Sequence, residues 1–214
     1  MIRLGLLHTA ATNVGIIDRA AAALAEPGLV LDHVVRTDLI AAAEAAGGLN
    51  AAISAETSRA LSDLLGRNDR VLITCSSLGP LADGDRVLRI DAALAEQAVV
   101  GGGRVSVLCT SPTTLEATER LFVAAATRTG AKVRVETVDG AWALFRAGDI
   151  ASYHRRIAEA AAQALDAGAD MVALAQLSMS EAVAVVDRPE QVLGCAEAGL
   201  RSVLGLGRSS LPSS

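Results

Sequence analysis

Short runs of β-branched residues and leucine alternate with longer alanine-rich segments along the chain. The short runs predict strands over residues 3–7, 29–35, 71–74, 87–90, 105–108, 133–138, 171–175 and 203–206. The longer segments carry their apolar residues on one helical stripe and predict helices over residues 15–26, 53–65, 115–129 and 150–167. Strands that alternate with helices in this way are typical of an α/β fold, in which helices flank both faces of a parallel sheet.

The chain also contains a weak internal repeat at a shift of 101 residues. This shift places residues 3–14 on 104–115, residues 30–37 on 131–138 and residues 69–78 on 170–179. One such match is expected by chance in an alanine-rich chain, but one shift that fits three strand regions indicates a duplication. We therefore expect two pseudo-symmetric α/β lobes, each with its own parallel sheet flanked by helices.

The repeat sets the expected lobe boundaries. The first lobe is expected to comprise residues 1–95 plus 192–214, and the second lobe residues 96–191. The chain would cross between the lobes near residues 93–104 and again near 189–194. Ligands of open α/β sheets bind beyond the carboxyl ends of the strands, so we expect the active site in the cleft between the lobes.

Cys75 is the main candidate for chemistry at these strand ends. It follows an apolar strand and precedes the sequence SSLGP, whose small and turn-forming residues leave backbone N–H groups free. N–H dipoles stabilise a thiolate, which then acts as a base or a nucleophile. The alternative is a buried strand cysteine without chemistry. The polar flank favours the reactive interpretation.

Hydroxyl side chains gather at the same strand ends. Thr113 and Thr114 lie where the helix over 115–129 begins, and Thr113 with Glu116 has the T-x-x-E spacing of a capping box. A helix N-terminus offers N–H groups to an anion, so a small carboxylate is the expected ligand, although each hydroxyl can equally be a helix cap. The candidate substrate-binding residues are His8, Thr9, Asn13, Ser76, Ser77, Thr110, Thr113 and Thr114.

Charge and composition exclude several classes of partner. With 19 Lys and Arg against 24 Asp and Glu, the net charge is -5, which leaves no uniformly basic surface for nucleic acid. The uncharged stretches are shorter than the roughly 18 to 20 residues that cross a bilayer, and the first residues form no signal-peptide core. We therefore expect a cytoplasmic protein that binds neither nucleic acid nor a membrane.

The cysteines and histidines do not form a metal-binding pattern. Cys75, Cys109 and Cys195 are odd in number and far apart, and the chain has no C-x-x-C, H-x-H or H-E-x-x-H sequence. We expect neither a disulfide framework nor a metal site. His33 and His154 are interpreted as ordinary strand-end and helix-surface residues.

Four segments of the chain are characteristic: ITCSSLGP around Cys75, LRIDAALAEQAV (88–99), VLCTSPTTL (107–115) and ADMVALAQLSMS (169–180). Together they resemble the aspartate/glutamate/hydantoin racemase superfamily of cofactor-independent enzymes. The resemblance extends from Leu6 to about Leu206 and is greatest to a branch with C-S-S and A-Q-x-S-M sequences. It implies an enzyme without a cofactor, and a dimer or other homo-oligomer.

The resemblance also implies a catalytic cysteine in each lobe, one on either side of the substrate's α-carbon. The first is Cys75, but the second position is Gln176, whose amide exchanges no proton near neutral pH. Ser178, Cys109 and His8 are the candidates to replace the second thiol. A hydroxyl such as that of Ser178 needs a neighbour that tunes it.

Three functions follow from this pattern. The first is a cofactor-independent isomerase or racemase that acts on a small carboxylate or amino-acid-like substrate, with Cys75 as acid/base or nucleophile. The second is a decarboxylase or lyase on a malonate-like acid, because one thiol suits chemistry on one face. The third is a non-catalytic carboxylate-binding protein. His8 either assists the thiol or bonds the backbone.

Overall fold

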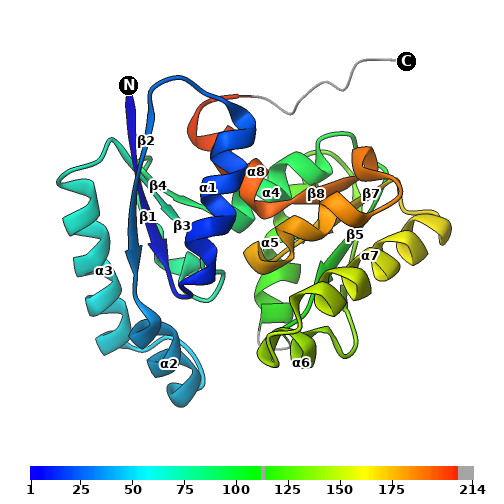
Figure 1. Cartoon of the computed structure of the whole chain (residues 1–214), viewed down its shortest axis with the longest axis horizontal. Helices are drawn as coiled ribbons and strands as arrows, with labels where there is room; N and C mark the ends of the chain where they lie inside the picture. Colours follow the sequence, from blue (N-terminus) through cyan, green and yellow to red (C-terminus); the bar gives the residue numbers. More distant parts are fainter. Residues whose placement is uncertain (112–113, 207–214) are drawn as a thin grey trace.

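The computed structural model describes residues 1–111 and 114–206, which form two four-stranded parallel sheets (Figure 1). The first sheet has the order β2 (Leu29–Val35), β1 (Ile2–His8), β3 (Arg70–Ile73), β4 (Val87–Arg89). The second has the matching order β6 (Lys132–Thr137), β5 (Arg104–Cys109), β7 (Met171–Leu174), β8 (Val192–Gly194). The predicted α/β fold with two similar lobes is confirmed.

The helices form layers outside and between the two sheets. They are α1 (Thr12–Leu24), α2 (Thr37–Ala46), α3 (Ala51–Leu65), α4 (Ile90–Val99), α5 (Leu115–Ala126), α6 (Ala141–Arg146), α7 (Ile150–Asp166) and α8 (Cys195–Val203). Helix α3 packs on β1 and β3 at one outer side, and α7 packs on β5 and β7 at the other (Figure 1). Helices α1, α4, α5 and α8 lie between the sheets.

The strand registers preserve the predicted repeat. Leu4 pairs with Arg70 between β1 and β3, and Val105 pairs with Met171 between β5 and β7. Each residue of the second pair therefore lies 101 positions after its counterpart in the first pair. The pairs β1–β2 and β5–β6 differ from this shift by one residue. Arg3 faces Val30, whereas Arg104 faces Lys132, a shift of 102 for the second strand. The alignment of 30–37 on 131–138 was therefore wrong by one residue.

The two lobes exchange helices at their junction. Helix α4 follows β4 of the first sheet but packs on α5 and β7, while α8 follows β8 of the second sheet and packs on α1 and β3. One hydrophobic cluster accordingly contains Leu72 from the first sheet, Val107 from the second, and Leu94 and Leu200 from the exchanged helices. The sheets thus share a single central core.

The C-terminal end of the chain differs from the prediction. Residues 203–206 were expected to form a strand, but Val203 ends α8 and residues 204–205 form a turn. The eighth strand is the three-residue β8, which pairs with β7 and follows a 3-10 segment at Pro189–Gln191. The return toward the first sheet, expected from residue 192, begins with α8 at Cys195.

Side-chain caps and buried stripes explain the longer helices. The Oδ1 atom of Asn50 accepts a hydrogen bond from Ile53 N at 3.0 Å at the start of α3, and Asp149 Oδ1 accepts one from Ser152 N at 3.1 Å before α7. The buried residues of α7 recur at helical spacing: Tyr153, Ile157, Ala161 and Leu165. Thr113 of the predicted capping box lies outside the described residues, while Glu116 stands in the first turn of α5.

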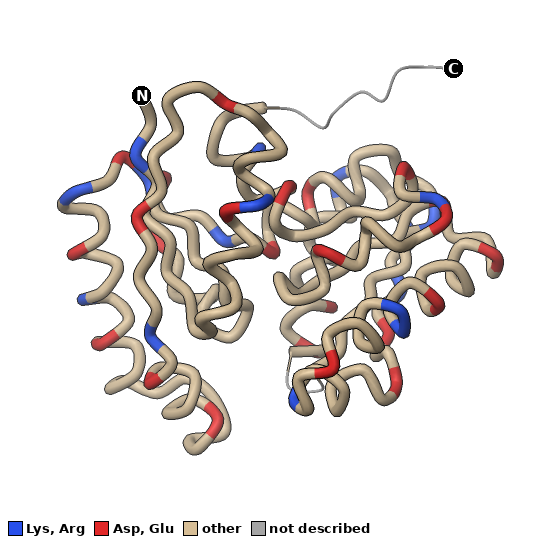
Figure 2. Tube along the Cα trace, in the orientation of Figure 1, with Lys and Arg blue, Asp and Glu red and all other residues tan. Residues whose placement is uncertain are grey.

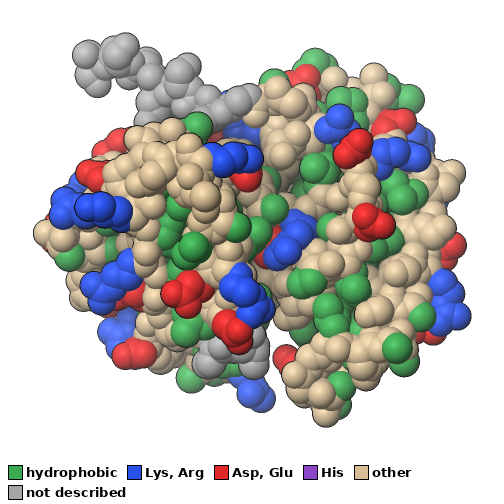
Figure 3. Space-filling model, turned by 180° about the vertical axis from the view of Figure 1, so that it is seen from behind, with side chains coloured by type: hydrophobic (Ala, Val, Ile, Leu, Met, Phe, Trp, Pro, Cys, Tyr) green, Lys and Arg blue, Asp and Glu red, His purple; other side chains and the backbone are tan. Residues whose placement is uncertain are grey.

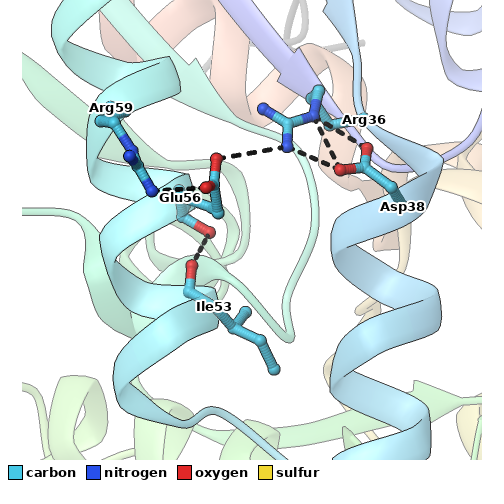
Figure 4. A network of polar contacts seen from close by, with 6 residues as sticks. Arg36, Asp38, Ile53, Glu56 and Arg59 are labelled. Carbon is cyan, nitrogen blue, oxygen red and sulfur yellow. Dashed lines mark hydrogen bonds and ion pairs between the residues drawn. The ribbon is translucent and has the colours of Figure 1, made fainter.

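Some charged residues join neighbouring surface elements. Arg36, which follows β2, contacts Asp38 of α2 at 2.6 Å and Glu56 of α3 at 3.8 Å, and Glu56 also pairs with Arg59 (Figure 4). Acidic and basic residues are interspersed over the outer helices (Figure 2). Among the described helices, none is long and apolar enough to span a bilayer.

Candidate active site

The carboxyl ends of both sheets face the same side of the molecule. Helices α2 and α6, which follow β2 and β6, both lie at the lower edge in Figure 1. Seen from behind, the space-filling surface has a notch between the two halves at this edge (Figure 3). Residues that follow the strands of either lobe therefore lie toward this side of the molecule.

Cys75 lies two residues beyond β3 and begins a tight turn. Its carbonyl accepts hydrogen bonds from Leu78 N at 3.2 Å and from Gly79 N at 2.9 Å. Its side chain is half-buried against the outer hydrophobic cluster of the first lobe. The turn leaves the N–H groups of Ser76 and Ser77 without an acceptor in the described part of the chain. The thiol and two free N–H groups therefore belong to one turn at the end of β3.

A partly buried ion pair packs against this turn. Arg89, the last residue of β4, donates from Nε and Nη2 to both carboxylate oxygens of Asp91 at 3.0 and 2.8 Å. A Cβ atom on Gly79 would lie 2.7 Å from Arg89 Nε, so glycine allows the turn to rest on the guanidinium. Arg86, by contrast, binds the carbonyls of Leu65, Asn68 and Asp69 at the opposite edge of the sheet.

Four predicted substrate-binding residues of the first lobe keep unpaired polar groups. Thr9 and Asn13 are more than nine-tenths buried, and Ser76 and Ser77 are half-buried. Within residues 1–111 and 114–206, none of these four side chains makes a hydrogen bond. Strands β1 and β3 are neighbours, so the residues that follow them lie at the same end of the sheet, and their unpaired polar groups can bind water or a polar ligand.

His8 is placed differently from those four residues. It is fully buried, with Nδ1 2.8 Å from Thr74 Oγ1 and Nε2 2.9 Å from His33 Nδ1, and the Nε2 atom of His33 is 3.2 Å from Asp18 Oδ1. Burial, and then the neighbouring His33, lower the pKa of His8 to about 4, so it is neutral at pH 7. His33 was interpreted as an ordinary residue because nothing in the sequence links it to His8 and Asp18.

Gln176 occupies in the second lobe the position that Cys75 occupies in the first. It lies two residues beyond β7, and its carbonyl accepts a hydrogen bond from Met179 N at 2.9 Å, as that of Cys75 does from Leu78 N. Its Oε1 atom accepts three hydrogen bonds, from Thr110 N at 2.6 Å, Thr110 Oγ1 at 2.7 Å and Ser111 N at 3.1 Å. These donors orient the amide, and its Nε2 has no acceptor among the described residues.

Ser178 is bound to a buried tyrosine. Its Oγ atom is 2.9 Å from Tyr153 OH, which is 3.3 Å from Thr110 Oγ1, and the Nε2 atom of His154 reaches only the backbone oxygen of Ser178 at 3.4 Å. Burial raises the pKa of Tyr153, so this phenol stays neutral. No described group beside Ser178 Oγ acts as a base toward it.

The remaining candidates of the second lobe are structural in their contacts. Cys109 is fully buried, and burial raises the pKa of its thiol to about 11. Thr114 donates its hydroxyl to Ser111 O at 2.9 Å, as a turn residue does. The thiol of Cys195, also buried, donates to Leu174 O at 3.1 Å. Thr113 lies outside the described residues.

A cavity opens away from Cys75. It has a volume of about 760 Å³ and lies between α1, the segment after β7, and α8, with Ile16, Arg19, Glu181 and Arg201 among its lining. Arg19 Nε donates to Glu181 Oε1 at 2.5 Å across it. It does not include Cys75, and its lining is mainly apolar, so the unpaired polar cluster remains the candidate site.

The metal-ligating side chains are dispersed. Among residues 1–111 and 114–206, no three His, Cys, Asp or Glu side chains are grouped closely enough to hold a metal ion.

Comparison with solved structures identifies the fold. The chain matches an allantoin racemase from Klebsiella pneumoniae with a TM-score of 0.69 and 18% identity over 100% of this chain and 95% of that one. It matches an aspartate racemase from Picrophilus torridus with a TM-score of 0.72 and 10% identity over 96% and 94%. A glutamate racemase from Bacillus anthracis gives a TM-score of 0.66 and 13% identity over 95% and 82%. The resemblance seen in the sequence motifs is thus confirmed at the level of the fold.

Neither a protein family model nor a curated protein sequence matches the chain.

Proposed function

We propose that the chain is a cofactor-independent isomerase of the racemase type, acting on a small carboxylate or amino-acid-like substrate between its lobes. The observation that carries the proposal is the position of Cys75. Of the three thiols it alone is not buried, and it follows β3 directly before Ser76 and Ser77, while Thr9 and Asn13 follow the neighbouring strand β1. A thiolate there would remove the proton from a substrate's α-carbon.

The unpaired groups are suited to hold the substrate's carboxylate. The backbone N–H groups of Ser76 and Ser77 and the side-chain amide of Asn13 are donors without acceptors in the described chain. The same donors would stabilise the enolate-like anion formed when the α-proton leaves, because its negative charge moves onto the carboxylate oxygens. From the other lobe, Gln176 Nε2 would add a further donor.

The nature of Gln176 favours chemistry on one face of the substrate. Racemisation needs a second acid on the face opposite Cys75, and neither the amide of Gln176 nor the tyrosine-bound hydroxyl of Ser178 supplies one. A decarboxylase or lyase acting on a malonate-like acid is therefore the second candidate. There carbon dioxide leaves and the Cys75 thiol protonates the remaining carbanion from one side.

The test is turnover in D₂O. The names of the structural neighbours suggest allantoin, aspartate and glutamate as probes, each as one enantiomer, and methylmalonate tests the second candidate. The proposal predicts that at least one probe gains deuterium at its α-carbon, which mass spectrometry measures. It also predicts that this exchange is lost in Cys75→Ala. Chiral chromatography separates the reactions, because racemisation yields both enantiomers and one-sided chemistry a single labelled product.

Two outcomes would contradict the proposal. The exposed Ser58→Ala variant on α3 serves as the control and keeps full exchange. Exchange that persists in Cys75→Ala would remove Cys75 from the reaction. Thermal stabilisation by a probe without any exchange would instead identify a carboxylate-binding protein that does no chemistry. The expected homo-oligomer is read from sedimentation of the same samples.

A further inference from the structure

A chain of hydrogen bonds leads from the surface of the first lobe to the residue before Cys75. It begins at Asp18 of α1, whose side chain is 55% exposed, and passes through His33 of β2 to the fully buried His8 of β1. From His8 it reaches the hydroxyl of Thr74. These residues stand on the face of the sheet that α1 covers, because strand side chains alternate between faces.

When His33 is neutral, only one assignment of donors and acceptors fits this series of hydrogen bonds. His33 then donates its Nε2–H to Asp18 and can only accept at Nδ1. His8 must donate its Nε2–H to that nitrogen, and it accepts at Nδ1 from the hydroxyl of Thr74. Each donor faces an acceptor, and the single hydroxyl proton of Thr74 is directed toward His8.

A proton on His33 reverses the rest of the chain. An imidazolium donates from both nitrogens, so His33 donates to Asp18 and also to His8 Nε2. His8 stays neutral, in keeping with its pKa of about 4, and now carries its proton on Nδ1, which donates to Thr74 Oγ1. The Thr74 hydroxyl then donates to Leu7 O, an oxygen 3.1 Å away.

We propose that this chain couples a proton bound near the surface to the position of Cys75. Protonation of His33 changes the tautomer of His8 and turns the hydroxyl of Thr74 from the ring to the carbonyl of Leu7. Thr74 N also donates to Leu7 O at 3.1 Å, so the switch alters the link between β1 and the end of β3. Its consequence for turnover rests on the proposed function, whereas the switch itself does not.

The charged groups around His33 are few. Asp18 and its neighbour Arg19 belong to α1, and Arg19 pairs with Glu181 across the lobes. Asp32 precedes His33 on β2 but points to the opposite face, where it binds Arg67 at 2.6 Å. Among the described residues, His8 and Asp18 are the titratable groups that hydrogen-bond to His33, so Asp18 is the carboxylate in contact with the imidazolium.

The first experiment observes the tautomer of His8 directly. Long-range ¹H–¹⁵N correlations on protein with ¹⁵N-labelled histidine distinguish Nδ1–H from Nε2–H, and they are recorded from about pH 8 to about pH 5. We expect His8 to be the Nε2–H tautomer at pH 8 and to become Nδ1–H as His33 takes up its proton. Asp18→Asn should move the switch to lower pH. Glu26→Gln changes an exposed acid that takes no part in these hydrogen bonds, and it should leave the pH of the switch unchanged. A His8 tautomer that stays constant while His33 titrates overturns the proposal.

The second experiment tests transmission to Cys75. The rate of its alkylation by iodoacetamide is measured across the same pH range in the wild type, Thr74→Ser and Thr74→Val. In the wild type and in Thr74→Ser, which keep a hydroxyl, we expect the plot of alkylation rate against pH to show two inflections. One belongs to the thiol itself, and the other lies at the pH of the His8 switch. Persistence of this inflection in Thr74→Val, or its absence from the wild type, overturns the coupling. Neither experiment uses a substrate, so failure of the proposed reaction would not affect their outcome.

Discussion

The carboxylates of Asp69 and Asp170 hold the central strands of the two lobes by the same hydrogen bond. Asp69 Oδ2 accepts from Arg3 N at 2.7 Å, and Asp170 Oδ2 accepts from Arg104 N at 2.7 Å. Each aspartate also donates its own N–H to the carbonyl of the same arginine, at 2.9 and 2.8 Å. The duplication has therefore kept a side-chain contact, and not only the strand order.

The second of these contacts depends on a glycine. A Cβ atom on Gly103 would lie 2.6 Å from Asp170 Oδ2, and Gly103 has φ +74. Gly130, with φ +72, has no atom within 4 Å of such a Cβ. We predict that Gly130→Ala lowers the free energy of unfolding by about 1 kcal/mol through backbone strain alone. Gly103→Ala should lose about 1 to 3 kcal/mol more, because the carboxylate must also move. Urea unfolding measures both, and equal losses would contradict the contact.

Buried His8 makes the stability of the fold depend on pH. In the unfolded chain the pKa of a histidine is about 6.5, whereas burial first, and His33 second, lower the pKa of His8 to about 4. The unfolded state therefore binds the proton at higher pH, and stability is complete above about pH 6.5 and falls as the pH drops toward 4. Between pH 7.5 and 5 we expect a loss of about 2 kcal/mol from this group.

The measurement is urea unfolding at both pH values in the wild type and in His8→Gln. The variant should lose about 2 kcal/mol less than the wild type between the two conditions, whatever its stability at pH 7.5. His154→Gln, a change of the half-exposed histidine on α7, is the control and should leave the pH dependence of the wild type. An unchanged dependence in His8→Gln would show that His8 is not buried as a neutral ring.

The three thiols should differ in reactivity. Cys75 is half-buried, while Cys109 and Cys195 are buried, and burial raises the pKa of the Cys109 thiol to about 11. At pH 7.5 we expect the native protein to take up one equivalent of iodoacetamide, counted by mass spectrometry, and Cys75→Ser to take up none. In urea the number of labelled thiols should rise to three in the wild type and to two in Cys75→Ser. Native labelling of Cys109 as fast as that of Cys75 would contradict this placement.

The sequence predicted those parts of the fold that depend on local pattern. Seven of the eight expected strands are present, each marked by an apolar run or by alternating apolar and polar residues. The repeat appears in residues such as Asp69 and Asp170 that make equivalent contacts. The strand at Val192–Gly194 was missed because its two apolar residues are followed by glycine, whereas the equally short β4 is extended by Ile90 in the sequence. The apolar run at 203–206 was misread because Val203 completes the buried stripe of α8.

The candidate site was predictable only in part. Cys75 and Gln176 were found because each follows an apolar strand at the same place in the repeat. The roles of His33 and Asp18 follow instead from the register that places β2 beside β1 and from the helix that covers both. Such contacts between residues 15 and 25 positions apart leave no spacing signal in the sequence.

The final prediction concerns the second face of the substrate. Thr110 N, Thr110 Oγ1 and Ser111 N all donate toward the side chain at position 176. In Gln176→Cys these three donors would face a thiol and stabilise its anion, since hydrogen bonds to a charged form favour that form. With a thiol on each lobe, a proton removed on one face can be replaced on the other.

We therefore expect Gln176→Cys to convert single-enantiomer exchange in D₂O into racemisation, with at least a tenfold gain (about 1.4 kcal/mol of barrier) in the rate of forming the opposite enantiomer. Gln176→Ser is the matched control, because serine is similar in size to cysteine but its hydroxyl is not ionised near neutral pH. Chiral chromatography of the deuterated product distinguishes the two variants. Equal rates in Gln176→Cys and Gln176→Ser would show that position 176 does not face the α-carbon from the side opposite Cys75.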